Sequence, residues 1–261
     1  MIKNTLKLFF FFLLLASTSF AGLRKEPKIV EHLGAKLPLN LTFVDASGHK
    51  IVLKDLFNKA TIVDFAYYEC PGICNPIMIE LAHTVSNLNL SPDRDYNLVT
   101  ISIDDKEGPK IAEREKKKFY NVLPQGYPKD AWHFLTGDSA SIAKITDAAG
   151  FFYKKDGPNF IHTGVLIFVD KDGKICRYLY PEAEPTGGFS ILPTDFEMAS
   201  METAKGTIMS MVGDQAQYCF ASTPKGGSKL AKLLIFSGSG VLFLLCIFVA
   251  LIIVRPKKKN T

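Results

Sequence analysis

Residues 65–76 read FAYYECPGICNP, and this stretch decides the fold. The residues that lead into it, 61–65 (TIVDF), form an apolar run that predicts a β-strand. The residues that follow it, 77–82 (IMIELA), predict a helix. Cys70 and Cys74 therefore lie at a strand-to-helix turn.

Two prolines constrain the conformation of this turn. Pro71 and Pro76 disfavour helical backbone angles in the residues that precede them. Asn75 followed by Pro76 is typical of an N-cap and a first helical residue. We therefore expect the helix to begin at Pro76, with both thiols in a loop where they can approach more closely than on a regular helix. A helix N-terminus also favours thiolate, so the turn predicts a reactive pair that can be oxidised or bind a soft metal ion.

Both ends of the chain predict export to a membrane. Residues 1–21 combine lysines, an apolar run and small residues near position 21, which is typical of a signal peptide cleaved before Gly22. Residues 230–254 predict a transmembrane helix, and residues 255–261 form a basic tail. Because positive charge stays on the cytoplasmic side, we expect a membrane-anchored protein with its soluble domain on the extracytoplasmic (periplasmic) side and its C-terminus in the cytoplasm.

The charge and the cysteines narrow the classes of function. The formal net charge of +5 is carried by the lysines and arginine at the two ends, which excludes nucleic acid as an expected partner. Export places the cysteines where disulfides persist, and one close pair with scattered single cysteines indicates a redox or metal site. Cys176 is expected to be buried in a strand, and Cys246 lies in the predicted span. Cys219 has two alternative interpretations, as an additional metal ligand or as a disulfide partner.

The chain between these ends has an alternating order of strands and helices. We expect an extended lead-in over 22–40, a domain over 41–212 and a linker over 213–229. Within the domain the patterns predict, in order, a hairpin (41–53), a strand (61–65), a helix (76–88), a strand (97–103), a helix (107–120), a strand (132–135), a helix (138–150), a hairpin (163–180) and a helix (194–212). This order predicts an α/β fold with a thioredoxin-like mixed sheet flanked by helices.

One histidine has a position that suggests a role. His162 immediately precedes the strand within 163–169, which in a thioredoxin-like sheet lies beside the strand that leads to Cys70. Two thiolates and an imidazole form a ligand set that suits Cu(I) and can hold Cu(II) or zinc. The alternative is a histidine without a metal, whose ring nitrogens have their hydrogen bonds satisfied in the core or at the surface. Asp104 closes the strand at the same end of the sheet, where we expect it to cap the next helix.

Several motifs together resemble the Sco/SenC family over about residues 35–210. They are FxYxxCPxxC at 65–74, SID at 102–104, WxFLTG at 132–137, and His162 ahead of a hairpin with DxxG at 170–173. The resemblance implies a thioredoxin-like factor that binds copper through Cys70, Cys74 and His162, with Asp104 in a supporting role. It also implies assembly of the dinuclear copper centre of cytochrome c oxidase. The chain differs from the family at Asn75, where a proline is usual, and in its C-terminal rather than N-terminal span.

Two hypotheses follow, and a third reading is structural. In the first, the protein is a metallochaperone that delivers copper to the copper-bearing oxidase subunit or to another periplasmic thiol or copper protein. In the second, it is a membrane-tethered thiol–disulfide oxidoreductase, in which Cys70 attacks and Cys74 resolves. In the structural reading, a Cys70–Cys74 disulfide only braces the loop and needs no His162.

Overall fold

The structure is a computed structural model that describes residues 26–92, 94–185 and 187–209. The predicted signal peptide, the linker 213–229, the predicted span 230–254 and the basic tail lie outside these residues. In the part of the chain that is described, no helix is long and apolar enough to cross a bilayer. The predictions about the ends of the chain therefore stay predictions.

The described residues form the following elements. In chain order they are β1 (Lys28–Ile29), β2 (Thr42–Asp45), β3 (Lys50–Val52), α2 (Leu53–Leu56), β4 (Ala60–Ala66), α3 (Cys74–Ser86), β5 (Tyr96–Ser102), α4 (Pro109–Tyr120), β6 (Trp132–Thr136), α5 (Ser139–Ala148), β7 (Phe151–Phe152), β8 (Lys154–Asp156), β9 (Asn159–Ile161), β10 (Leu166–Val169), β11 (Ile175–Leu179), β12 (Glu182–Ala183), β13 (Phe189–Ser190) and α6 (Pro193–Ala204).

A seven-stranded sheet forms the centre of the domain, in the order β11-β10-β4-β5-β6-β2-β3. Strands β4, β5 and β6 are parallel, whereas β10 runs antiparallel to β4 and β2 antiparallel to β6. Every residue of β4 and β5 is buried, as expected for strands that are covered on both faces. The fold is the mixed, thioredoxin-like α/β fold that the sequence predicted.

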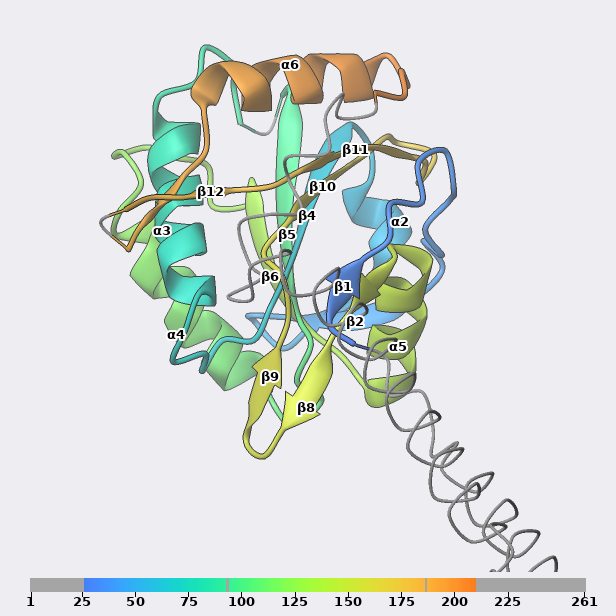
Figure 1. Cartoon of the computed structure of the whole chain (residues 1–261). Helices are drawn as coiled ribbons and strands as arrows, with labels where there is room; N and C mark the ends of the chain where they lie inside the picture. The colour runs from blue at the N-terminus through green and yellow to red at the C-terminus, as the bar shows by residue number, and fades with distance from the viewer. Residues whose placement is uncertain (1–25, 93, 186, 210–261) are drawn as a thin grey trace, which may run out of the picture. The chain divides into compact units, whose positions relative to one another are not determined.

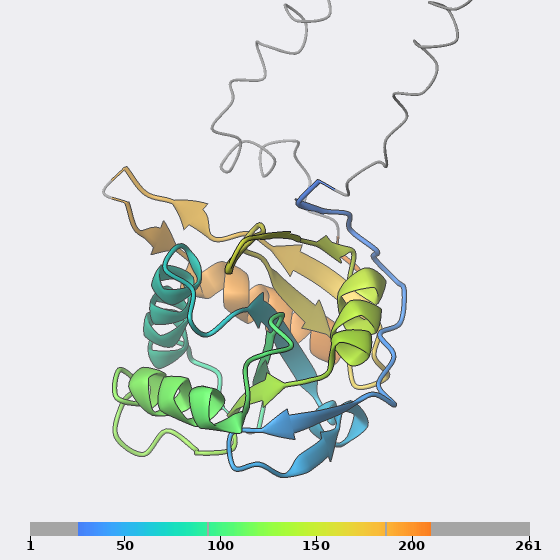
Figure 2. The ribbon, with the colours of Figure 1, turned by 90° about the horizontal axis from the view of Figure 1, so that it is seen from below.

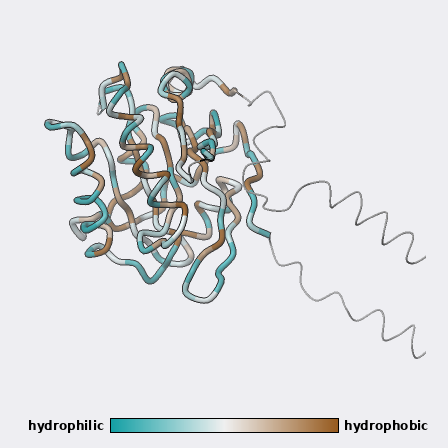
Figure 3. The backbone as a smooth tube through the Cα atoms, turned by 60° about the vertical axis from the view of Figure 1, so that its left-hand side comes forward, coloured by the Kyte–Doolittle hydropathy of each residue, from teal (hydrophilic) through white to brown (hydrophobic). Residues whose placement is uncertain are grey.

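Helices cover both faces of this sheet. Because β4, β5 and β6 are adjacent, right-handed crossovers place α3 and α4 on the same face, and α5 lies on the other (Figures 1 and 2). Helix α6 packs against β4, β10 and β11. Hydrophobic residues gather in the central strands, whereas the outer turns and the β8–β9 hairpin are more hydrophilic (Figure 3).

The register of the sheet brings the two predicted parts of the site to one end. β10 pairs with β4 so that Leu166 faces Asp64 and Val169 faces Thr61. The beginning of β10 therefore lies beside the carboxyl end of β4, where the cysteine turn begins. His162, four residues before β10, is placed at this end of the sheet, as the sequence predicted.

Some of the predicted boundaries were wrong. The last helix was expected over 194–212, but α6 ends at Ala204, and Gly206 follows with a φ of 70°. This left-handed conformation favours glycine and ends helices. The lead-in, expected to be extended, also pairs with the sheet, because Gly34 and Leu37 donate backbone hydrogen bonds to the carbonyl oxygens of Ile175 and Gly173. The lead-in thus covers the outer edge of β11, which would otherwise be open to pairing with another chain.

Candidate metal centre

The cysteine turn has one thiol in the loop and one in the helix. Helix α3 begins at Cys74, with Ile73 as its N-cap, and not at Pro76 as expected. The first N–H groups of a helix have no partner within the helix, so Pro76 fits as the third helical residue without losing a hydrogen bond. The side chain of Asn75 does not cap the helix, because its amide Nδ2 donates to the carbonyl oxygen of Cys70 at 3.3 Å.

The three predicted ligands come together. The Sγ atoms of Cys70 and Cys74 and a ring nitrogen of His162 lie within 4.8 Å of one another. Both cysteines are buried and the histidine is half-buried, so the site opens to solvent on the imidazole side. With metal–sulfur bonds of about 2.3 Å, the ligands of a trigonal site lie roughly 4 Å apart, and this cluster therefore fits one metal ion.

The ring of His162 presents its Nε2 atom to the thiols. Nε2 lies 3.2 Å from the Sγ atom of Cys74, and Nδ1 lies 3.3 Å from the carbonyl oxygen of Thr163. In the tautomer that donates from Nδ1, the lone pair of Nε2 faces the cluster, which is the form that binds metals. The ring also contacts Phe151 and Tyr67, with centroid distances of 5.7 and 6.1 Å.

The two thiols differ in acidity. The pKa of Cys70 is lowered, chiefly because the thiol of Cys74 donates a hydrogen bond to it, and the N–H of Gly72 donates another at 3.3 Å. The pKa of Cys74 is raised, because its proton is held in that hydrogen bond and because the group is buried. Cys70 is therefore the thiolate of the pair, and a metal that binds both sulfurs must displace the proton of Cys74.

Two residues beside the cluster were not assigned from the sequence. Asp64 is buried on β4, and burial raises its pKa to about 7, although the nearby His162 and a hydrogen bond from Thr100 lower it. Asp64 is the only charged residue in the apolar run TIVDF. A lone charge in a predicted buried strand is the sequence signal that could have identified it. Tyr67 contacts Cys70 through its hydroxyl, and burial followed by this hydrogen bond raises its pKa to about 12.

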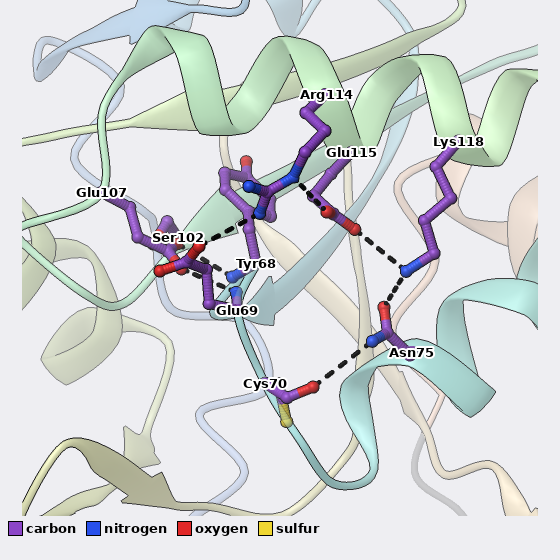
Figure 4. A network of polar contacts seen from close by, with 9 residues as sticks. All are labelled: Tyr68, Glu69, Cys70, Asn75, Ser102, Glu107, Arg114, Glu115 and Lys118. Carbon is purple, nitrogen blue, oxygen red and sulfur yellow. Dashed lines mark hydrogen bonds and ion pairs between the residues drawn. The ribbon is translucent and has the colours of Figure 1, made fainter.

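The residues after β5 differ from the prediction. Asp104 does not cap α4, because the N-cap is Gly108 and has no side-chain bond. The Oδ1 atom of Asp104 instead accepts from the backbone N–H of Lys106 at 3.0 Å. The carboxylate near the cysteine loop is that of Glu107, which accepts hydrogen bonds from backbone N–H groups just before Cys70 (Figure 4).

The remaining cysteines take no part in this cluster within the described residues. Cys176 is fully buried on β11, as predicted, and Cys70, Cys74 and Cys176 are all free thiols. Cys219 and Cys246 lie outside the residues that the structure describes.

Comparison with known proteins places the chain among relatives of one kind. A "SCO2-like protein" of Rickettsia conorii is 26% identical over 157 residues, which cover 58% of this chain and 72% of the relative. A "SCO1 protein homolog" of Bacillus subtilis is 27% identical over 152 residues, which cover 54% of this chain and 75% of the relative.

Solved structures share the fold. The crystal structure of a candidate electron transfer protein from Aquifex aeolicus VF5 matches with a TM-score of 0.57 and 26% identity, covering 67% of this chain and 95% of that one. Arabidopsis thaliana ScoI with copper bound matches with a TM-score of 0.50 and 20% identity, covering 62% and 96%.

The family comparison includes the whole candidate site. The sequence profile of the SCO1/SenC family matches residues 34–190 of this chain, which is more than half of its 261 residues. The match contains Cys70, Cys74 and His162, and the fold and the cluster agree with it. The chain therefore belongs to the SCO1/SenC family.

Proposed function

We propose that this protein is a copper metallochaperone that carries the ion between Cys70, Cys74 and His162. The observation that carries the proposal is the cluster of these three ligand atoms within 4.8 Å of one another. The proposed cargo is copper because two thiolates and one imidazole are soft and borderline ligands that suit Cu(I) and can also hold Cu(II). The copper in the solved structure of Arabidopsis thaliana ScoI supports this choice.

The site is built for exchange as much as for retention. Both thiols are buried, but the imidazole is half-buried, so a partner can approach the ion from the histidine side. A three-ligand site leaves a coordination position that an incoming ligand can occupy. This supports transfer of copper to a partner protein over permanent storage.

The proposed client is the copper-bearing subunit of cytochrome c oxidase, or another periplasmic thiol or copper protein. Membership of the SCO1/SenC family supports this client class. The predicted signal peptide and the predicted span 230–254 would hold the domain at the outer face of a membrane, close to such a client.

A second candidate function is favoured by the unequal acidity of the thiols. The Cys70 thiolate would attack a client disulfide, forming a mixed disulfide and releasing one client thiolate. Cys74, after losing its proton, would attack the Sγ atom of Cys70 and release the second client thiolate. The client then gains two electrons, and the protein is left with a Cys70–Cys74 disulfide that an external dithiol must reduce.

Copper binding by the reduced full-length chain tests the first function. We expect one Cu(I) per chain in a titration against a competing chelator, and at least about tenfold weaker binding for His162→Ala, a loss of about 1.4 kcal/mol. His49→Ala is the matched control, because this histidine is exposed and pairs with Asp45. The copper proposal fails if the wild type binds no Cu(I) tightly or if His162→Ala binds as the wild type does.

A further inference from the structure

One buried carboxylate holds the backbone just before Cys70. The Oε2 atom of Glu107 accepts from the N–H of Tyr68, and its Oε1 atom accepts from the N–H of Glu69, both at 2.8 Å. The hydroxyl of Ser102 donates to the same carboxylate. Glu107 is only 6% exposed, so these bonds are shielded from water. The N–H groups of the two residues that precede Cys70 are thus fixed by a side chain from the loop before α4.

A second set of contacts holds the backbone just after Cys70. Asn75 donates from Nδ2 to the carbonyl oxygen of Cys70 at 3.3 Å, and its Oδ1 atom accepts from Lys118 at 2.7 Å. The ammonium group of Lys118 also donates to Glu115 at 3.1 Å. Both Glu115 and Lys118 belong to α4, and Glu115 is buried. The carbonyl of Cys70 is therefore tied, through Asn75, to the same helix.

Arg114 joins the two sets of contacts. Its guanidinium lies 3.1 Å from Glu115 and 3.2 Å from Glu69. The contacts thus run from Glu69 over α4 to Asn75 and back to Cys70 (Figure 4). We call this set of residues (Glu69, Asn75, Glu107, Arg114, Glu115 and Lys118) the α4 brace.

Burial of carboxylates needs a reason, because an ionised carboxylate that leaves water loses hydration energy. Burial raises the pKa of Glu107, and the hydrogen bonds from Ser102, Tyr68 and Glu69 act against that rise. Neither Glu107 nor Glu115 belongs to the ligand cluster. What these two carboxylates contact is the cysteine loop and the side chains that hold it.

We propose that the α4 brace holds the cysteine pair in its reduced, metal-ready geometry and opposes closure of the Cys70–Cys74 disulfide. In the structure the two sulfurs are free and in hydrogen-bond contact. A disulfide needs them about 2.05 Å apart, so the loop or the first turn of α3 must move. The brace fixes the backbone on both sides of Cys70 and therefore makes that movement costly. Glu107 and Lys118 are positioning residues in this proposal.

The redox equilibrium of the pair gives a direct test. The full-length chain is equilibrated with dithiothreitol buffers and alkylated, and the peptide that contains both cysteines is quantified by mass spectrometry. We expect Glu107→Ala to favour the disulfide about tenfold, a potential about 30 mV more negative. Glu107→Gln, which keeps one acceptor oxygen, should lie between this variant and the wild type. Lys118→Met should favour the disulfide about threefold.

Lys117→Met is the matched control for Lys118→Met. It removes the same charge from the neighbouring position, but Lys117 pairs with the exposed Glu113 and not with the loop, so the potential should stay that of the wild type. If Glu107→Ala does not fold, the potentials of Lys118→Met and Asn75→Ala test the proposal instead. The side chains of Lys118 and Asn75 are at least partly exposed, so we expect these variants to fold. Wild-type potentials in Glu107→Gln and Lys118→Met, with urea unfolding curves that show folded protein, overturn the proposal.

The measurement of copper affinity rests on the proposed function, whereas the measurement of the reduction potential does not. If the wild type binds no copper, the metallochaperone proposal fails, and the potentials still test the brace. If the wild type binds copper and the variants show no shift in potential, the brace proposal fails and the proposed function stands. If both hold, Glu107→Ala should also bind Cu(I) several-fold more weakly than the wild type.

Discussion

The two halves of the metal centre are held by different kinds of interaction. The thiol half is fixed by directional hydrogen bonds and ion pairs from the α4 brace. The imidazole half follows the β8–β9 hairpin and is held by ring contacts with Phe151 and Tyr67 and by one longer hydrogen bond, between Nδ1 and the carbonyl oxygen of Thr163 at 3.3 Å. Directional contacts fix a geometry, whereas ring packing tolerates small rotations. We therefore expect the contacts of the thiol half to set the reduction potential of the cysteine pair. We expect the position of the imidazole to affect how readily the metal binds and leaves.

The ring contacts extend beyond His162 into the hairpin. Phe160 packs against Tyr67 at 5.2 Å and against Tyr153 at 5.7 Å between ring centroids. The ammonium group of Lys155 lies 5.2 Å from the centroid of the Phe160 ring. Phe160 is therefore the residue that links the hairpin to the strand end that carries the cysteine turn.

The largest effect is expected at Asp64, which is buried on β4 close enough to His162 and Cys74 to interact with both electrostatically. Its pKa is raised by burial to about 7 in the folded protein, so its ionisation destabilises the fold as the pH rises above the pKa of the unfolded chain, near 3.8. Asp64→Asn removes that cost. We expect the free energy of unfolding to rise by up to about 4 kcal/mol at pH 8 and by less than about 1 kcal/mol at pH 4, where the carboxyl is neutral in the folded protein and about half ionised in the unfolded chain.

Urea unfolding of both proteins across this pH range checks the expectation. The measurement at pH 4 serves as the internal control for any change in packing. A gain of stability that is the same at pH 4 and pH 8 would show that Asp64 does not carry a raised pKa.

A smaller effect is expected from the imidazole half. Phe160→Ala removes the ring contacts with Tyr67 and Tyr153 and should lower the free energy of unfolding by about 3 kcal/mol. Copper affinity should fall, because Tyr67, which contacts the ring of His162, loses its packing against Phe160, while the potential of the cysteine pair should hardly change. Phe160→Leu is the control that keeps most of the apolar volume. A shift in potential as large as that of Glu107→Ala would contradict the separation between the two halves.

The smallest effect is expected at the exposed part of the thiol half. Arg114 and Glu69 are 56% and 58% exposed in their side chains, and ion pairs of this kind contribute about 1 kcal/mol or less. Glu69→Gln, which removes this exposed pair and leaves the contact between Arg114 and the buried Glu115, should therefore change the free energy of unfolding by at most that amount, and the difference should vanish in molar salt. A loss of several kcal/mol would mean that the pair of Glu69 and Arg114, and not the buried Glu107, is the main anchor of the loop.

The sequence predicted the central fold well because its strands carry a strong pattern. β4 and β5 are apolar, β-branched runs, and the predicted helix 138–150 is found as α5, whose N-cap Asp138 accepts from the N–H of Ser141. The site was predictable for a topological reason. In a sheet of this kind the residue before β10 must lie beside the end of β4, so His162 could be assigned a position near the thiols.

Other features depend on contacts that local patterns do not encode. The start of α3 was misplaced because the rule for residues before proline is a tendency, and the first turn of a helix tolerates proline. Glu107 lies in the charged segment DDKEGPK and differs from its neighbours only in what it contacts after folding. The end of α6 was misplaced because the helical pattern continues beyond Gly206, whose positive φ ends the helix.

X-ray absorption spectroscopy of the copper-loaded, reduced full-length chain tests the central claim most directly. We predict that copper in the wild type is bound by two sulfur atoms and one imidazole nitrogen. His162→Ala should lose the imidazole signal and keep both sulfurs. Persistence of the imidazole signal in His162→Ala, or a single sulfur ligand in the wild type, would contradict the assignment of Cys70, Cys74 and His162 as the copper site.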